Sequence, residues 1–217
     1  MNNFEYVTRK QLSPVKKELI QIINSVQNLV REDFTFQFYF VGSVKRNMVT
    51  YDVGTNIGYD LDVNIQVNDN DCRFSEKEIK NKIGSALNKA VSHFAYDNAE
   101  DSTRVFTIKV KDRKNSRILH SCDLAIVNDY MDDEGNKHQE YIHFNKKQKS
   151  YSWKEQPEEY YLLNEKVEWI KDNKYWNEVR ELYLYKKNIN TDIHKHSRSI
   201  YAETIHEICQ KYGYYNS

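Results

Sequence analysis

The apolar residues near the start of the chain first follow a helical period and then a strand period. Pro14 is followed by apolar residues at helical spacing as far as Val30, and Ser13 is the expected cap of that helix. Phenylalanine then recurs at every second position from Phe34 to Phe40, which predicts a strand with one buried face. We therefore expect a helix packed against a sheet.

A second strand is predicted at residues 60–67, where polar and apolar side chains alternate. The apolar set lies on one face, and the opposite face carries Asp60 and Asp62. The polar stretch at residues 44–58, which precedes this strand, is expected to form a short helix and a loop. The pattern therefore predicts a half-buried strand with carboxylates on its open face.

The middle of the chain continues with one helix and two strands. Ser75 begins a capping box, and the helix after it is predicted to end near His93. Strands are predicted at residues 104–111 and 118–127, and the second is apolar on both faces around a single acid, Asp123. A buried central strand with a single carboxylate requires an explanation.

The last third of the chain is predicted to be mainly helical. A short strand near residues 138–144 is followed by a polar, lysine-rich loop at 145–156. Helical periodicity then occupies residues 157–171, 174–187 and 197–211. The sheet is therefore expected to end before residue 145.

Composition limits the class of protein. The 32 basic and 32 acidic side chains cancel, so no global positive field would hold nucleic acid non-specifically. Cys72, Cys122 and Cys209 are widely spaced and odd in number, which argues against a disulfide framework. No apolar run approaches the roughly 18 residues needed to cross a bilayer. We expect a cytoplasmic protein with no membrane partner.

The acidic residues have the spacing of a metal site. Asp60 and Asp62 project to the same face of a strand, and carboxylate oxygens are the ligands that Mg²⁺ prefers. Asp123, from a neighbouring strand, would complete a site for two ions that activate an acceptor oxygen and stabilise a triphosphate. Gly42 and Ser43 lie where the phenylalanine strand ends, and free amides with a hydroxyl suit a phosphate. A solvated strand face and an ordinary turn are the plainer interpretations of these motifs taken singly.

Taken together, these motifs resemble the catalytic core of the DNA polymerase beta nucleotidyltransferases. The resemblance covers residues 36–127 and is most specific in the segments 40–46 (FVGSVKR) and 58–65 (GYDLDVNI). It implies that two Mg²⁺ ions are bound by Asp60, Asp62 and Asp123, which are then the catalytic residues. It also implies that Gly42 and Ser43 hold the triphosphate of a nucleoside triphosphate (NTP).

The resemblance implies an α+β fold, in which a mixed sheet is flanked by helices and a helical C-terminal part packs on the core. We assign residues 1–144 to the catalytic core and 145–217 to the helical region. Sixteen residues separate Ser43 from Asp60, more than in compact members of the superfamily. The segment 54–58 (GTNIG) is similar to the loop of oligoadenylate-synthase-like enzymes and bacterial cyclic-oligonucleotide synthases.

That branch also places a basic and a hydroxylated residue from its C-terminal helices near the phosphates. The resemblance nominates Lys186 or Lys187 and Ser199 for these roles, with Tyr201 as a base-stacking ring. Surface helix residues are the plainer interpretation of all these positions. Arg104 precedes a strand next to the expected site and could neutralise phosphate charge, although a solvated role is the commoner one.

The expected reaction transfers a nucleoside monophosphate from an NTP to an acceptor hydroxyl and releases pyrophosphate. The loop before the acids favours oligonucleotide or cyclic nucleotide products, and the acceptor stays open between a second nucleotide, a small molecule, RNA and a protein. A phosphatase of the haloacid-dehalogenase type also uses Asp-x-Asp, but its acids follow an apolar strand, whereas Val63, Ile65 and Val67 come after the acids here. A non-catalytic nucleotide-binding module is a further alternative, and retention of all three acids argues against it.

Overall fold

The computed structural model describes residues 2–69, 73–156 and 163–216. The chain divides into two compact units. The sheet unit contains residues 7–49 and 56–156, and the helical unit contains residues 1–6, 50–55 and 157–217. The division predicted at residue 144 stays a prediction.

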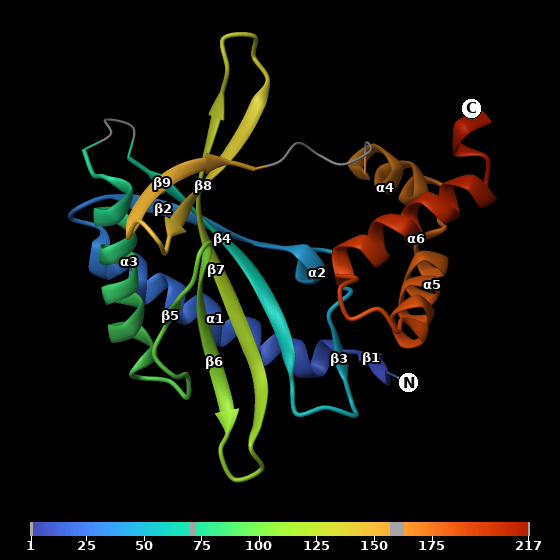
Figure 1. Ribbon diagram of the computed structural model, residues 1–217, viewed down its shortest axis with the longest axis horizontal. Coiled ribbons are helices and arrows are strands. Elements are labelled where there is room, and N and C mark those ends of the chain that lie inside the picture. Colours follow the sequence, from blue (N-terminus) through green and yellow to red (C-terminus); the bar gives the residue numbers. More distant parts are fainter. Residues whose placement is uncertain (1, 70–72, 157–162, 217) are drawn as a thin grey trace. The chain divides into compact units, whose positions relative to one another are not determined.

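The sheet unit is built on a mixed sheet, which confirms the predicted α+β class (Figure 1). Its strands run in the order β2, β4, β7, β6, β5; the pair β4–β7 is parallel, and the neighbouring pairs β2–β4, β7–β6 and β6–β5 are antiparallel. Their bounds are β2 Thr35–Val41, β4 Tyr59–Asn68, β5 Glu100–Asp101, β6 Val105–Asp112 and β7 Arg117–Met131. Strand β8 (Lys137–Asn145) pairs with the end of β7, and β9 (Ser150–Glu155) pairs with β8.

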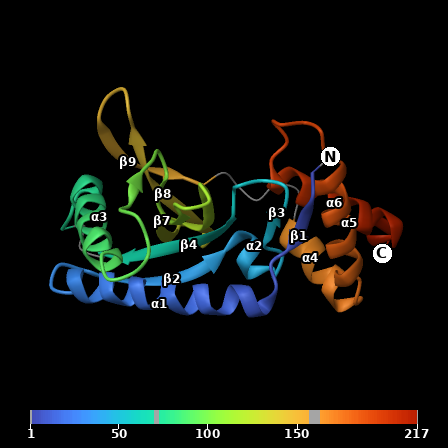
Figure 2. The ribbon, with the colours of Figure 1, turned by 90° about the horizontal axis from the view of Figure 1, so that it is seen from below.

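Two helices, α1 (Arg9–Val30) and α3 (Glu76–Val91), cover one face of this sheet (Figure 2). The alternating apolar residues of β4 are buried on that face, with Leu61, Val63 and Ile65 at most 1% exposed. Because successive side chains of a strand point to opposite faces, the polar half of β4 lies on the opposite side of the sheet. We call that side the open face.

Helix α1 begins earlier than the sequence indicated. Thr8, and not Ser13, is the N-cap, because Thr8 accepts from the Gln11 backbone while the Gln11 side chain accepts from the Thr8 backbone. This capping box gives hydrogen-bond partners to two backbone N–H groups at the start of the helix. Ser13 lies inside the helix. The capping box predicted at Ser75 is confirmed for α3.

The lysine-rich segment predicted as a loop contains strand β9, so that prediction was wrong. Tyr151 and Trp153 alternate with polar residues and pack against the core, with Trp153 opposite Ile142 of β8. The alternation was present in the sequence, but the surrounding lysines made the segment look like a solvated loop. Lysines on one face of a strand pair are compatible with a buried opposite face.

The sheet curls toward its open face. Gln139 of β8 donates to the Tyr39 hydroxyl of β2 at 2.8 Å, although β4 and β7 lie between these strands in the sheet order. Asn64 of β4 also donates to the Gln139 side-chain oxygen, at 3.3 Å. Side chains on strands that are separated by two other strands can meet on one face only where the twisted sheet is concave on that face.

The helical unit contains helices α4 (Leu163–Asp172), α5 (Trp176–Ile189) and α6 (Ser197–Lys211), and a 3₁₀ turn at Tyr214–Asn216. The helices predicted at 174–187 and 197–211 are confirmed, and the first half of the helix predicted at 157–171 lies largely outside the described residues. A two-stranded sheet of β1 (Phe4–Tyr6) and β3 (Thr50–Asp52) belongs to the same unit. In the described parts of the chain, no helix is both long and apolar enough to cross a membrane.

Candidate functional site

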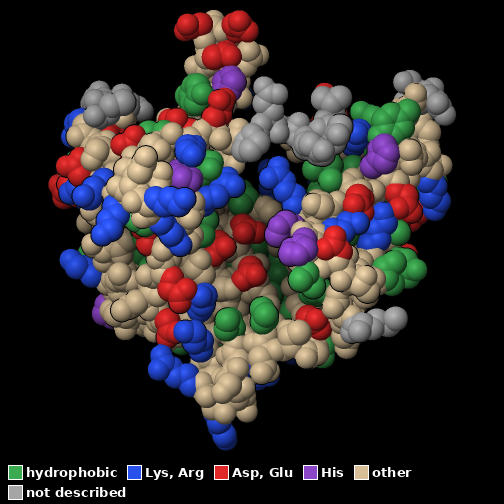
Figure 3. Space-filling model, viewed as in Figure 1, with side chains coloured by type: hydrophobic (Ala, Val, Ile, Leu, Met, Phe, Trp, Pro, Cys, Tyr) green, Lys and Arg blue, Asp and Glu red, His purple; other side chains and the backbone are tan. Residues whose placement is uncertain are grey.

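The three aspartates that the sequence singled out share the open face of the sheet. Asp62 of β4 and Asp123 of β7 are register partners on neighbouring parallel strands, so their side chains project to the same side. Asp60 lies two residues before Asp62 and therefore on the same face. Figure 3 shows acidic side chains gathered over β4 and β7 in the middle of this face.

Two hydroxyl groups orient the outer carboxylates. The Ser121 hydroxyl, opposite Asp60 in the register, donates to Asp60. The Thr107 hydroxyl, on the neighbouring strand β6, donates to Asp123 at 2.6 Å. Sequence reasoning did not identify Ser121 or Thr107. Ser121 could have been predicted, because it lies two residues before Asp123 and therefore on the same face of the strand. Thr107 could not, because its place opposite Asp123 depends on the β6–β7 register.

The carboxylates perturb one another. Burial, followed by the negative charges of Asp123 and Asp60, raises the pKa of Asp62 to about 6, while the Arg46 guanidinium acts in the opposite direction. Burial also raises the pKa of Asp123, against the effect of its hydrogen bond from Thr107. A cation bound among these carboxylates would offset the repulsion between their negative charges, so the arrangement favours cation binding.

The Gly-Ser turn lies directly against the central acid. Strand β2 ends at Val41, and Gly42 begins the four-residue helix α2 (Gly42–Lys45) with a φ of +58°. A Cβ on Gly42 would lie 2.5 Å from the Asp62 Oδ2 atom, so only glycine permits this approach without a shift. The Met48 amide donates to the Ser43 carbonyl at 2.9 Å and closes the turn after it.

A second close approach fixes the start of β4. A Cβ on Gly58 would lie 2.0 Å from the Leu119 carbonyl oxygen of β7. The Ile118 amide donates to the Asn56 carbonyl at 2.9 Å in the same place. Glycine at this position therefore lets β4 approach β7 closely enough to bring Asp60 beside Ser121.

No protein-family model and no curated protein matches this sequence. Solved structures do match. The CdnE c-di-GMP synthase from Capnocytophaga granulosa superposes with a TM-score of 0.62 at 14% identity, covering 96% of this chain and 63% of that chain. The Vibrio cholerae DncV cyclic AMP-GMP synthase gives 0.57 at 10% identity, covering 83% and 61%. The chain spans about three fifths of the length of these proteins.

The chain has the fold of the bacterial cyclic dinucleotide synthases. This finding confirms the predicted polymerase-beta-like nucleotidyltransferase fold. At these identities the likeness concerns the fold, and the roles of individual residues stay predictions.

The donor set of the site suits a hard divalent cation. Asp60, Asp62 and Asp123 offer only carboxylate oxygens, and Gly42 leaves the Asp62 carboxylate room beside the backbone. Within residues 2–69, 73–156 and 163–216, however, no three His, Cys, Asp or Glu side chains are close enough to hold an ion as they stand. Two of the carboxylates accept from hydroxyl groups instead, so a cation would have to draw them together.

The nominated residues of the C-terminal helices belong to the helical unit. Lys187 of α5 is 8% exposed, and its ammonium donates to the Thr50 hydroxyl at 2.7 Å and lies 3.9 Å from the Phe4 ring centroid. Tyr201 of α6 is buried, and Ser199 is exposed in the first turn of that helix. Their nucleotide contacts stay predictions.

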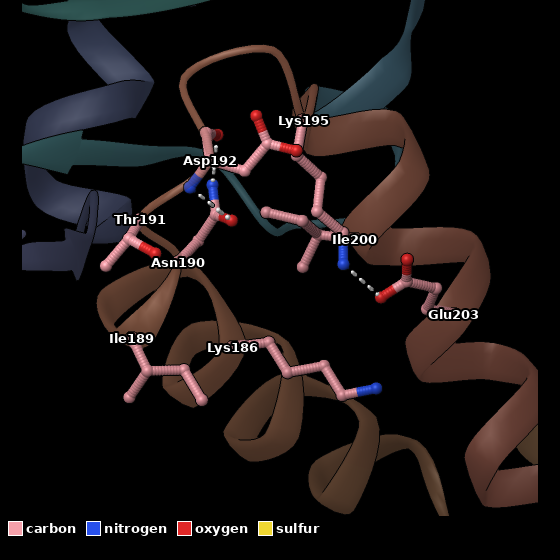
Figure 4. A pocket seen from close by; sticks show the side chains of 8 residues that line it. All are labelled: Lys186, Ile189, Asn190, Thr191, Asp192, Lys195, Ile200 and Glu203. Atoms are coloured by element: carbon pink, nitrogen blue, oxygen red, sulfur yellow. Dashed lines mark hydrogen bonds and ion pairs between the residues drawn. The ribbon is translucent and has the colours of Figure 1, made fainter.

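A pocket of about 390 Å³ lies in the helical unit beside these helices (Figure 4). Its lining residues are Lys186, Ile189, Asn190, Thr191, Asp192, Lys195, Ile200 and Glu203. Both of its lysines are paired, Lys186 with Glu207 at 2.5 Å and Lys195 with Glu203 at 2.7 Å. Because the positive charges are already neutralised, this pocket has no strong electrostatic preference for phosphate.

Proposed function

We propose that this protein is a magnesium-dependent nucleotidyltransferase that transfers a nucleoside monophosphate from an NTP to an acceptor hydroxyl, with cyclic or linear oligonucleotides as products. The observation that carries the proposal is the register that sets Asp62 beside Asp123 on the open face, with Asp60 on the same face and Gly42 against Asp62. Cytoplasmic location is part of the same proposal.

The solved structures with this fold support the choice of substrate. The Elizabethkingia meningoseptica CdnE cyclic dinucleotide synthase was solved with GTP and Apcpp. The Vibrio cholerae DncV synthase was solved with a linear intermediate. A protein with the same fold and three aspartates on the open face has the parts to bind an NTP and a second nucleotide as acceptor.

In the proposed mechanism Asp60, Asp62 and Asp123 would hold two divalent cations. Such ions, when bound, supply charge that lowers the pKa of an acceptor hydroxyl and neutralises a triphosphate. Asp123 accepts the proton of the acceptor hydroxyl, which attacks the α-phosphorus in line with the departing pyrophosphate. The Gly42 and Ser43 amides and the Ser43 hydroxyl donate to the triphosphate.

The hydroxyl groups of Ser121 and Thr107 have a positioning role in this mechanism. Ser121 donates to one oxygen of the Asp60 carboxylate, and Thr107 donates to one oxygen of the Asp123 carboxylate. Each hydrogen bond fixes the orientation of its carboxylate, so that the second oxygen can accept from or coordinate another partner. A hydrogen bond to a charged group contributes about 1.5–3 kcal/mol. This is enough to select one carboxylate rotamer from several.

The test is to incubate the protein with all four labelled NTPs and Mg²⁺ and to resolve the products. Cyclic or linear oligonucleotides with pyrophosphate release are expected, and Asp62→Asn should abolish both. Asp133→Asn, in the exposed turn between β7 and β8, is the matched control that removes one carboxylate away from the site. Pyrophosphate release only when RNA, a protein or a small molecule is added would reassign the acceptor, and NTP binding without turnover would indicate a non-catalytic module.

A further inference from the structure

Strand β2 lies at one end of the sheet order, and in the described residues no strand pairs with its second edge. On its first edge it pairs with β4, in antiparallel register from Thr35 opposite Asn68 to Val41 opposite Asp62. Outside that ladder, residues 35–41 form no backbone hydrogen bond within the described chain. In an edge strand every second residue turns its N–H and C=O groups away from the neighbouring strand. The outer edge of β2 therefore presents a row of backbone donors and acceptors that a further strand could pair with.

The side chains of β2 do not block an added strand. The segment 35–41 (TFQFYFV) has no charged residue and no proline, although 29% of the residues in the chain are charged. Natural proteins protect an edge strand by making it short, charged, bulged or interrupted by proline. Strand β5 is the short acidic pair Glu100–Asp101, and the outer strand β9 carries Lys154 and Glu155. By contrast, β2 is seven residues long, uncharged and without a register shift, so it is the edge that suits strand addition.

The aromatic side chains of β2 are incompletely covered. They lie on the face of the sheet that α1 and α3 cover, where Phe36 is 2% exposed. Phe38 and Phe40 pack against the core but stay partly exposed. On the open face, Gln37 is exposed. An added strand would therefore cover aromatic surface as well as pair the backbone.

The sequence of β2 is complementary to itself. In an antiparallel pair formed about a two-fold axis at Phe38, Phe36 of each copy lies opposite Phe40 of the other. Gln37 lies opposite Tyr39 in the same register. A two-fold axis perpendicular to the sheet keeps the helix-covered faces of both copies on one side, so the phenylalanines meet there. Aromatic pairs across neighbouring strands stabilise a sheet.

The charges that flank β2 match this arrangement. Antiparallel pairing brings the start of the strand in one copy beside its end in the other. Glu32 precedes the start, Lys45 follows the end, and the Lys16 ammonium lies 4.6 Å from the ring centroid of Phe40 near that end. Within the parts of the chain that the structure describes, these three charged groups form no ion pair. Opposite charges would therefore face each other at both ends of the paired strands.

We propose that the outer edge of β2 is a self-association surface, on which a second copy of this chain adds its own β2 in antiparallel register. The product is a two-fold dimer with one continuous sheet. Backbone hydrogen bonds hold the two strands together, and the aromatic pairs and flanking charges fix their register. This dimer is independent of the proposed nucleotidyl transfer, because it uses neither the three aspartates nor a nucleotide.

The test places a charge that faces its own copy across the two-fold axis. In the proposed register the two Gln37 side chains lie diagonally across the new strand pair, roughly 7–8 Å apart. Gln37→Lys and Gln37→Glu should each raise the Kd of the dimer about tenfold, from repulsion at an effective dielectric between those of water and a protein surface. A mixture of the two variants should restore association, because opposite charges then face each other.

A charge on the neighbouring strand provides the matched control. Gln66 is the register partner of Gln37 on β4 and shares the open face, but it lies one strand inside the edge. Gln66→Lys should keep the Kd within about twofold of the wild-type value, since an exposed charge away from a contact contributes little. Thermal unfolding of every variant checks that the fold is retained.

Association is measured by sedimentation velocity on the full chain from about 10 µM to about 1 mM, the range in which a weak dimer dissociates. Hydrogen exchange at both concentrations should show added protection of β2 amides in the dimer and no change in α6. A wild type that stays monomeric throughout this range would overturn the proposal. A dimer that neither Gln37 variant weakens, or that the mixture does not restore, would also overturn it, because the contact would then lie outside the two-fold β2 pair.

Discussion

Replacing Asp62 by asparagine should abolish nucleotidyl transfer and at the same time stabilise the metal-free protein. Burial and the charges of Asp123 and Asp60 oppose ionisation of Asp62, which raises its pKa to about 6. At neutral pH the ionised carboxylate therefore costs folding free energy. Asparagine has nearly the same shape and carries no charge, so it removes this cost and also removes a ligand for the cation.

The size of the effect follows from the pKa. A rise from 3.8 to about 6 is roughly two pKa units, and each unit corresponds to about 1.4 kcal/mol. The upper bound is thus about 3 kcal/mol, and because Asp62 is partly exposed, screening reduces it to about 1–2 kcal/mol. For a chain of this size each kcal/mol shifts the Tm by about 2–4 °C. We expect Asp62→Asn to raise the Tm by about 2–8 °C.

The stabilisation by Asp62→Asn should depend on pH, and the direction of the pKa shift sets the sign of that dependence. The folded-state pKa of Asp62 lies above its unfolded value, so stability is greatest below about 3.8 and is lost as the pH rises through about 6. The variant and the wild type should therefore unfold at similar temperatures near pH 4 and differ fully at pH 8. The measurement is thermal unfolding in a chelating buffer at both pH values, with Asp133→Asn as the control for removal of an exposed carboxylate.

Mg²⁺ completes the test, because a ligand that binds only the folded protein raises its stability. Addition of Mg²⁺ should raise the Tm of the wild type at pH 8 and leave that of Asp62→Asn nearly unchanged. If the variant were no more stable than the wild type at pH 8 in the metal-free buffer, the electrostatic reasoning about the three acids would be wrong. A variant that kept near-normal turnover would contradict the metal assignment.

Three further predictions concern other parts of the sheet unit. Gly42→Ala should lower kcat about a hundredfold, because the new methyl group would meet the Asp62 carboxylate at 2.5 Å and displacement of a reacting group costs about that much. Thr107→Val should lower kcat about 10- to 100-fold, since it removes the hydrogen bond that orients Asp123, worth about 1.5–3 kcal/mol. His138 donates to the carboxylates of Asp132 and Glu155, and these hydrogen bonds raise its pKa, so the amide protection factors of the β7–β8 hairpin should fall as the pH rises above 6.5.

Each of these predictions has a control in the chain. Thr107→Ser retains the hydroxyl and should keep most of the activity, and equal loss in the serine and valine variants would argue against a role for the hydrogen bond. Gly54→Ala introduces a methyl group with only an ordinary contact at 3.4 Å and should leave kcat near the wild-type value. His138→Gln should make the hairpin protection independent of pH, and persistence of the pH effect in that variant would exclude His138 as its source.

The elements with a strong period could be predicted from the sequence. Strand β4 and helix α3 were clear because one buried face repeats every second or every third to fourth residue. The short strands β1 and β3 were not, because three residues hold too little periodicity to stand out. Their pairing, Phe4 with Asp52, joins segments far apart in the chain and depends on tertiary contacts.

The acids and the hydroxyl groups that orient them also differ in how far the sequence alone could predict their positions. Asp60 and Asp62 are separated by one residue, so a strand period alone places them on one face. Asp123 stood out as the single acid in an apolar strand, but its position opposite Asp62 depends on the β4–β7 register. Thr107 is an ordinary strand threonine until the β6–β7 register brings it against Asp123.

The curl of the sheet connects these local results to the function. Tyr39 and Gln139, on strands separated by two others, meet over Asn64 and hold the open face concave. A flat sheet would set the acids of β4 and β7 along one plane, with each carboxylate solvated separately. A concave sheet turns the three carboxylates toward one volume, which is the arrangement that the proposed pair of cations requires.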